Sequence, residues 1–154
     1  MINLADNLVR QIGLLYRYMM RALEAETAPL GMGAGRFSYL FMLYINEGVT
    51  QQEMAYRLQA DKAAVARTLV QLEDQGYVER RSDPSDRRVT RVFLTDKSRA
   101  LQADLETAVE RVIDRMQLNQ GVAEQRIIRK ELNEMLKSLD QHYKVATNNG
   151  KQSG

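Results

Sequence analysis

The stretch from Thr50 to Thr95 restricts the possible folds of this 154-residue chain more than any other part of it. Thr50 and Asp61 each precede a short run with helical periodicity, and their side-chain oxygens suit the backbone N–H groups of a first helical turn. Only residues 59–60 separate the two runs, and Gly76 stands where the second helix should end. The pattern predicts two short helices joined by a tight turn within residues 50–76.

The second of these helices should have two distinct faces. Val65, Leu69 and Leu72 are spaced i, i+4 and i+7, so we expect them to be buried together. The rest of the helix surface should stay exposed and able to contact a partner, and it carries Lys62, Ala63, Arg67 and Gln71.

A charged hairpin follows the second helix. Residues 77–81 and 90–94 are predicted to form paired strands around a turn-rich loop, 82–89. Five arginines and two aspartates lie between Arg80 and Arg91, which gives this segment a net charge of +3 against +2 for the whole chain. Positive charge is therefore concentrated where a polyanion would be expected to bind. We expect Asp86 to pair with Arg88 at the base of the loop.

A helix-turn-helix followed by a basic β-ribbon is the arrangement called a winged helix. Its second helix can enter the major groove of DNA, and its loop can reach phosphates or the adjoining minor groove. The sequence thus predicts a mainly α, α+β fold with a winged helix-turn-helix that binds double-stranded DNA. The residues expected to contact DNA are Thr50, Gln51, Gln52, Lys62, Ala63, Ala64, Arg67, Thr68, Gln71, Arg87, Arg88 and Arg91.

Several of these residues also have a simpler interpretation, because charged and amide side chains are mostly exposed on any protein surface. Arg67, taken alone, could be a solvated helix residue, and Arg87 and Arg88 could serve only solubility. For Gln51, Gln52 and Lys62, phosphate contact and solvated surface have about equal support. The position of Arg67 opposite a buried stripe, in the second helix of a helix-turn-helix, favours DNA contact for that residue.

Amphipathic helices flank this module. They are predicted over about residues 2–27, 36–46, 96–119 and 123–146, and the polar residues 147–154 should form a flexible tail. The core face of the 36–46 helix should comprise Phe37, Leu40, Phe41, Tyr44 and Ile45. The three longer helices carry apolar stripes running from Leu4 to Leu23, Leu101 to Met116, and Ile128 to Tyr143.

These long stripes leave two possibilities open. They could pack into a bundle within one chain, or the first and last two helices could build a two-fold dimer. We favour the dimer, because a small winged helix cannot cover such stripes and a symmetric pair can read a pseudo-palindromic DNA site.

The segments Asp61–Arg67, Leu72–Arg80, Asp83–Arg88 and Val92–Thr95 resemble those of the MarR-type transcriptional regulators. The last two together resemble that family's wing signature, an Asp-x-Arg followed by a strand ending in Leu-Thr. The surrounding helices also fit the layout of the family, so the resemblance covers most of the chain. It implies a single MarR-type domain over residues 1–146.

The resemblance implies a homodimeric repressor that a small effector releases from its operator, with Arg88 in the minor groove and Arg87 nearby. Family members often bind phenolic or other aromatic anions between the dimer helices and the DNA-binding lobe. The residues on segments that would line such a pocket are Tyr16, Met19, Met20, Phe37, Tyr39, Phe41 and Met42. Core packing explains the same residues, and for any single one we prefer that interpretation.

Other functions find little support in the sequence. The chain has no cysteine, and His142 is its only histidine, so we expect no metal site, no cofactor and no enzymatic activity. No apolar run approaches the ~20 residues that span a bilayer, and no signal peptide is recognisable, which favours a cytoplasmic protein without membrane contact. The alternative function is a winged helix used for protein–protein assembly, and a lyase or hydrolase is a distant third.

Overall fold

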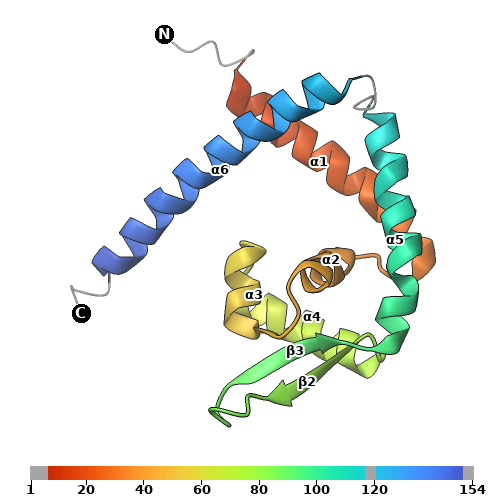
Figure 1. Ribbon diagram of the computed structural model, residues 1–154, viewed down its shortest axis with the longest axis vertical. Coiled ribbons are helices and arrows are strands. Elements are labelled where there is room, and N and C mark those ends of the chain that lie inside the picture. Colours follow the sequence, from red (N-terminus) through yellow and green to blue (C-terminus); the bar gives the residue numbers. More distant parts are fainter. Residues whose placement is uncertain (1–6, 117–120, 151–154) are drawn as a thin grey trace. The chain divides into compact units, whose positions relative to one another are not determined.

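The computed structural model describes residues 7–116 and 121–150, with side chains described up to residue 141 (Figure 1). The chain divides into two compact units, Met1–Val112 and Ile113–Gly154, which we describe separately. Unit 1 contains helices α1 (Leu8–Thr27), α2 (Phe37–Ile45), α3 (Gln51–Arg57) and α4 (Lys62–Asp74), a short 3-10 helix η1 (Ala28–Leu30), strands β1 (Val49–Thr50), β2 (Val78–Ser82) and β3 (Thr90–Leu94), and most of α5 (Asp96–Arg115). Unit 2 contains the end of α5 and the long helix α6 (Val122–Gly150).

The predicted helix-turn-helix is confirmed as α3 and α4. Thr50 Oγ1 accepts a hydrogen bond from the backbone N–H of Glu53 at 3.1 Å, and the Glu53 carboxylate accepts one from the N–H of Thr50 at 2.7 Å. This reciprocal pair is a capping box. Asp61 caps α4, because its Oδ1 accepts from the N–H groups of Ala63 and Ala64 at 2.9 and 3.0 Å. Gly76 has φ +74° just after α4, as its predicted role in ending the helix requires.

The sheet has three strands rather than the predicted two. Its order is β1-β3-β2, all antiparallel, and β1 pairs Val49 with Val92 and Thr50 with Arg91. Two residues are too few to show the alternation that identifies a strand in a sequence, so β1 could not be recognised there. The β2–β3 hairpin was predicted, with β2 displaced by one residue.

The core of unit 1 is formed by α2, the helix-turn-helix, the sheet and α5. The largest fully buried aliphatic side chains include Leu40, Leu43, Met54, Leu69, Leu72 and Leu105. The predicted burial of Val65, Leu69 and Leu72 on one face of α4 is confirmed. The face predicted for α2 needs correction: Ile45 is exposed and Tyr44 half-buried, whereas Tyr39, Met42 and Leu43 are buried. This nine-residue helix is buried over most of its circumference, so spacing alone could not identify its exposed end.

The boundaries of the flanking helices differ modestly from expectation. The predicted start at residue 2, Leu4, and residues 117–119 of the helix predicted over 96–119 fall outside the described residues. Helix α6 continues to Gly150, so residues 147–150, which the sequence assigned to a tail, are helical. Thr147 and the two asparagines after it have only modest helix penalties, which is why they do not end a long helix. Among the described helices, none is long and apolar enough for a membrane span.

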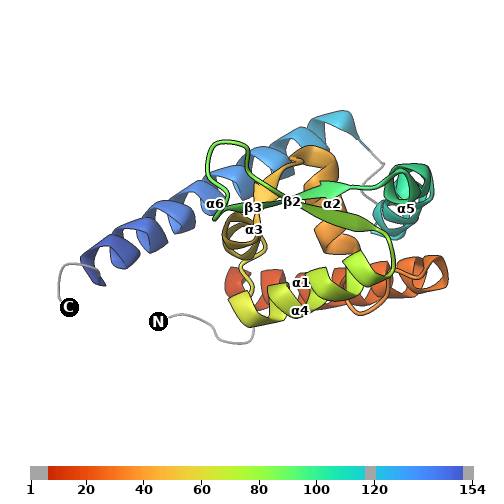
Figure 2. The same ribbon diagram turned by 90° about the horizontal axis from the view of Figure 1, so that it is seen from below.

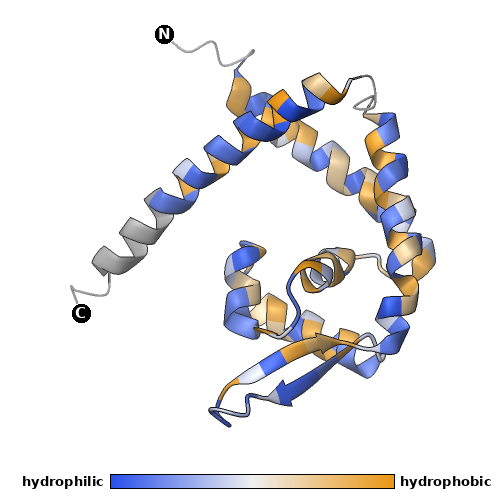
Figure 3. Ribbon diagram, in the orientation of Figure 1, coloured by the Kyte–Doolittle hydropathy of each residue, from blue (hydrophilic) through white to orange (hydrophobic). Residues whose placement is uncertain are grey.

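The apolar stripes of α1 and α6 are largely exposed in the single chain. On α1, Leu8, Ile12 and Leu15 are exposed, and Leu23 is the one described residue of the apolar stripe that is buried. On α6, Leu132 is 43% exposed and Leu136 is 64% exposed. Figure 3 shows apolar residues recurring along both helices among polar ones. The stripe of α5 differs, since Leu105 and Val112 are buried.

Neighbouring residues on α4 offer a direct test of this packing. Leu69 is fully buried, so Leu69→Ala should lower the free energy of unfolding by about 2–5 kcal/mol through lost apolar contact and a residual cavity. Val70 beside it is 42% exposed, so Val70→Ala should change stability by less than about 1 kcal/mol. Urea unfolding followed by circular dichroism measures both. Equal losses in the two variants would contradict the assigned helix face.

Candidate nucleic-acid interface

The exposed face of α4 carries the residues predicted for it. Lys62, Ala63, Arg67 and Gln71 are all exposed. Ala64 and Thr68 are half-buried, and the Thr68 hydroxyl donates to the Ala64 carbonyl at 3.0 Å. Val70 was not predicted as part of this surface, but its 42% exposure places an apolar side chain one turn beyond Arg67. Its place on the helical wheel was the available signal, because it lies away from the buried stripe of Val65, Leu69 and Leu72.

The loop between β2 and β3, residues 83–89, which we call the wing loop, is fastened at its base by Asp83 and Arg91. Their side chains form an ion pair, and Arg91 Nη1 also donates to the Gly48 carbonyl at 2.8 Å. The Asp83 carboxylate further accepts the N–H of Ser85 at 2.8 Å and its hydroxyl. The Ser85 hydroxyl, followed by Arg91, holds the pKa of Asp83 well below its ordinary value. Arg91, predicted as a DNA contact, is therefore also a structural tie between the wing and the start of α3.

Asp86 and Arg88 form the predicted ion pair, but farther along the loop than expected. The Arg88 guanidinium donates to both carboxylate oxygens of Asp86 at 3.0 Å, and the backbone N–H of Arg88 donates to Oδ1. The base of the loop is closed by Asp83 and Arg91 instead, because these residues sit next to the last paired positions of the two strands. The Arg88 side chain remains 90% exposed despite its partner.

The other arginines of the hairpin differ in their contacts with neighbouring side chains. Arg80 pairs with Glu73 of α4, and Arg81 pairs with Glu79 while its guanidinium lies 4.7 Å from the centre of the Phe93 ring. Arg87 and Arg88 are the exposed arginines of the wing loop. Arg80 and Arg81 are exposed as well, so the positive charge of the hairpin faces solvent along β2 and at the wing loop.

Helix α3 lies between the other two elements. It contacts both α4 and β3, and Figures 1 and 2 show the wing loop, α3 and the start of α4 along one side of unit 1. Gln52 is exposed on α3, while Thr50 and Gln51 are half-buried. The three segments that carry the predicted contact residues therefore lie along one side of unit 1, although they are separate in the sequence.

The residues predicted for an effector pocket fall on α1 and α2. Phe37 is buried and meets Phe41 edge to face, with ring centres 5.6 Å apart, which is ordinary aromatic core packing. Tyr39 and Met42 are buried as well. On α1, Tyr16 is exposed and Met19 and Met20 are half-buried. The α2 residues therefore pack in the core, as the simpler interpretation of these side chains expects.

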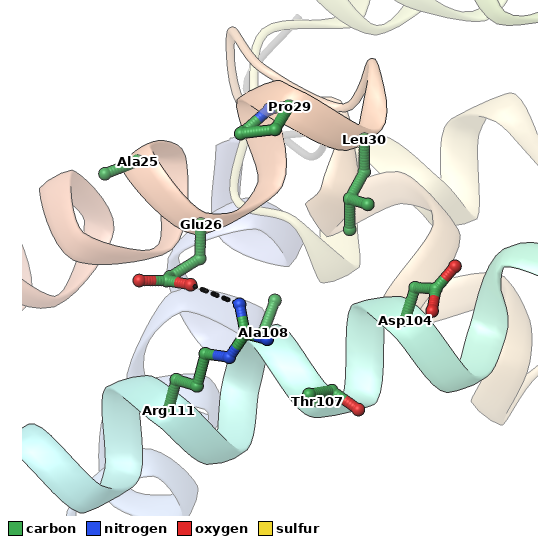
Figure 4. A pocket seen from close by; sticks show the side chains of 8 residues that line it. All are labelled: Ala25, Glu26, Pro29, Leu30, Asp104, Thr107, Ala108 and Arg111. Atoms are coloured by element: carbon green, nitrogen blue, oxygen red, sulfur yellow. Dashed lines mark hydrogen bonds and ion pairs between the residues drawn. The ribbon is translucent and has the colours of Figure 1, made fainter.

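A hollow of about 180 Å³ lies elsewhere in unit 1, between the end of α1, η1 and α5 (Figure 4). Its lining is Ala25, Glu26, Pro29, Leu30, Asp104, Thr107, Ala108 and Arg111. Arg111 Nη1 lies 3.2 Å from a carboxylate oxygen of Glu26, whose side chain is nearly buried, so this ion pair ties α1 to α5. Within the part of the chain that the structure describes, no cluster of histidine, cysteine or acidic residues is arranged to hold a metal ion.

Comparison with known sequences identifies relatives. A sequence profile of the MarR family matches residues 34–90. The uncharacterized HTH-type transcriptional regulator YdgJ of Bacillus subtilis is 35% identical over 101 residues, and YybA of the same organism is 27% identical over 94 residues. These matches cover 66% and 61% of this chain. They span only 62% and 63% of the two relatives, so the chain matches about three fifths of their length.

Comparison with solved structures gives longer matches. A MarR transcriptional regulator from Methanosarcina mazei superimposes with a TM-score of 0.80 and 31% identity, covering 87% of this chain and 96% of the other. A mutant of Escherichia coli MarR, solved in complex with operator DNA, gives a TM-score of 0.73 and 26% identity, covering 84% of this chain and 93% of the other.

The Asp83 contacts predict how the wing responds to acid. Because the folded pKa of Asp83 is lowered, its stabilising contribution should be fully present above the unfolded value of about 3.9 and lost as pH falls toward the folded value. The Ser85 amide should thus stay protected from exchange between pH 7 and about pH 4, as NMR can measure. Asp83→Asn should speed that exchange, whereas the control Asp86→Asn should not. A measured pKa of the Asp83 carboxyl at or above its ordinary value of 3.8 would contradict this assignment.

Proposed function

The chain belongs to the MarR family of transcriptional regulators, and from this premise we propose that it is a sequence-specific DNA-binding regulator. The observation that carries the proposal is the surface on which the exposed face of α4 and the arginine-bearing wing loop lie together. Arg67 offers base or phosphate contacts from a helix, and Arg87 and Arg88 offer them from a loop. The related mutant of Escherichia coli MarR, solved in complex with operator DNA, supports DNA binding by this chain.

In this proposal α4 enters the major groove and the wing loop reaches the minor groove or its phosphates. Lys62, Ala63, Ala64, Arg67, Thr68 and Gln71 contact the duplex from α4, Thr50, Gln51 and Gln52 from α3, and Arg87, Arg88 and Arg91 from the wing. Arg91 has a second task, because its bonds to Asp83 and Gly48 fix the wing loop in position. The Asp86 pair should likewise direct the Arg88 guanidinium.

We further propose that the regulator is a cytoplasmic homodimer and a repressor rather than an enzyme. The exposed apolar stripes of α1 and α6 support an interface with a second copy, which would cover them. Residues 1–146 would then act as one domain in each protomer. A two-fold dimer presents two α4 helices to the two halves of a pseudo-palindromic operator.

The last part of the proposal is an aromatic or phenolic effector that releases the protein from its operator. Tyr16, Met19 and Met20 of α1, with Phe37 and Phe41 of α2, are its proposed contacts. The exposure of Tyr16 and the partial exposure of both methionines support the α1 part of this set. A protein–protein assembly module is the disfavoured alternative, because it gives no reason to gather arginines on the wing loop and α4.

Two substitutions separate the roles of helix and wing. Arg88→Ala should weaken specific and random duplexes alike and lower the salt dependence of binding by about one unit per half-site, because a phosphate or minor-groove contact is lost. Arg67→Ala should cost about 1–3 kcal/mol per half-site, chiefly on the preferred sequence, if Arg67 bonds a base edge. Titrations at several salt concentrations measure both effects on an operator first obtained by selection from random duplexes.

Neither arginine lies on a buried face, so both variants should melt like the wild type. Wild-type binding by both folded variants would remove the winged helix as the DNA-reading surface. The assembly module would then become the better explanation.

The dimer is tested on α6. Leu132→Asp or Leu136→Asp should raise the dimer dissociation constant at least about a hundredfold, because an unpaired carboxylate would be buried in the interface. Operator binding should weaken with it. Lys130→Ala, an exposed change on the same helix, serves as the control. Sedimentation equilibrium measures the association, and a wild type that is monomeric at micromolar concentration would refute the dimer.

A further inference from the structure

The loop of residues 31–36 joins η1 to α2 and has no role in the function described so far. A side chain of α1 holds it, because the Glu24 carboxylate accepts the backbone N–H of Ala34 at 2.6 Å with one oxygen and that of Gly35 at 3.2 Å with the other. We propose that Glu24 is a positioning residue for DNA reading, which holds this loop in the conformation that fixes the C-terminal end of α4. The proposal rests on the proposed function.

The backbone of the loop is bent around the carboxylate. Ala34 has φ +58° and Gly35 has φ +73°. A residue with a Cβ seldom adopts this left-handed region, because the Cβ crowds the following carbonyl, so the conformation costs free energy at Ala34. Successive N–H groups in a turn form a favourable site for an anion. The two hydrogen bonds to Glu24 therefore offset the cost of the loop conformation.

Gly33 leaves room for the carboxylate. It is buried, and a Cβ added to it would lie 2.8 Å from Oε1 of Glu24 and 3.4 Å from the Cβ of Ala28. The Ala28 contact is ordinary, but the contact with Oε1 is too short, so any side chain at position 33 would displace the end of the Glu24 side chain. The absence of a side chain at this position is thus a condition for the contact between α1 and the loop.

The same loop contacts the residues at which α4 ends. Arg36 Nε donates to the Gly33 carbonyl at 2.9 Å, and its Nη1 donates to Oε1 of Gln75 at 2.8 Å. Gln75 is the C-cap residue of α4. At the other end of the loop, Gly31 lies beside the hydroxyl of Tyr77, which an added Cβ would approach to 3.3 Å. Both ends of the loop therefore lie against the end of the proposed reading helix.

These contacts connect Glu24 to α4 without any contact between Glu24 and DNA. Without the carboxylate, Ala34 would relax toward negative φ, and the loop that carries Arg36 would move away from Gln75. Helix α4 would keep its buried face and its contacts with α5, so it would stay folded but lose one of its fixed positions. Hydrogen bonds to base edges need accurate geometry, whereas phosphate contacts carry no sequence information. Loss of Glu24 should therefore weaken binding to the preferred sequence more than binding to random DNA.

The first test is Glu24→Ala in the full-length protein, on the selected operator and on random duplexes. Operator binding should weaken about five- to tenfold, the low end of couplings between separate sites. Binding to random duplexes and its salt dependence should stay as in the wild type, because no phosphate contact is lost. Glu110→Ala, which removes an exposed carboxylate from α5, is the matched control and should leave the ratio of operator to random binding unchanged.

Substitutions within the loop distinguish positioning from general stability. Gly33→Ala should reproduce the effect of Glu24→Ala by displacing the carboxylate, and the two together should cost no more than either alone. Ala34→Gly should restore part of the operator affinity of Glu24→Ala, because glycine adopts positive φ without strain. Amide exchange followed by NMR should be slow at Ala34 and Gly35 in the wild type and faster in Glu24→Ala.

The outcomes separate this inference from the function on which it rests. If Arg67→Ala and Arg88→Ala weaken DNA binding while folded Glu24→Ala and Gly33→Ala bind the operator as wild type, only this inference is overturned. Equal losses on operator and random duplexes would also overturn it, because a displaced α4 affects base readout first. If Glu24→Ala melts below the assay temperature, Gly33→Ala, which keeps the carboxylate, decides the question. A wild type that binds no duplex would remove the proposed function as well.

Discussion

The two-residue strand β1 is the connection on which the geometry of the presented surface depends. It pairs with β3 at Val92 and Arg91, directly before the capping box that starts α3. Arg91 reinforces the same connection, since its side chain holds both Asp83 and the carbonyl of Gly48. The residue at 48 must be glycine-like, because its φ is +76° and an added Cβ would lie 3.2 Å from the Phe93 ring. Helix-turn-helix and wing are thereby joined as one rigid surface.

A second set of bonds joins that surface to α5. The Thr95 hydroxyl donates to the Gly76 carbonyl at 2.7 Å, and the Ser98 hydroxyl donates to the Tyr77 carbonyl. Lys97 donates to the Gln75 carbonyl at 2.7 Å and lies 4.0 Å from the centre of the Tyr77 ring. The C-terminal end of α4 is thus held by the first turn of α5. Any displacement of that turn must move α4 with it, so α5 and the proposed DNA-reading helix are mechanically coupled.

The sequence was sufficient for the parts of the fold with local signals. Thr50, Asp61 and Gly76 marked the helix boundaries, because capping and positive φ depend on a few adjacent residues. Structure that depends on distant residues was not predictable in this way. Strand β1 exists only because Val92 lies opposite Val49. The partner of Arg91 is Asp83, eight residues earlier in the sequence, and the register of the hairpin determines this pairing.

On the candidate surface, too, features with a local signal were predictable and features that depend on distant residues were not. The exposed face of α4 followed from helical spacing, and the pair of Asp86 with Arg88 from their separation of two residues. The position of α3 between α4 and β3 depends on contacts between elements distant in the sequence, which no periodicity contains. The burial of Tyr39 and Met42 likewise followed from the surroundings of α2, which is buried over most of its circumference.

The cap of α4 has a consequence for how such a protein would search DNA. The first turn of a helix is an attractive site for any phosphate, whatever the sequence around it. Here the Asp61 carboxylate already occupies the amides of Ala63 and Ala64, and its negative charge repels a phosphate from that end. Attraction to random DNA is therefore reduced at the tip of the reading helix. Discrimination between sites is thereby left to the side chains on the exposed face of α4 and not to its backbone amides.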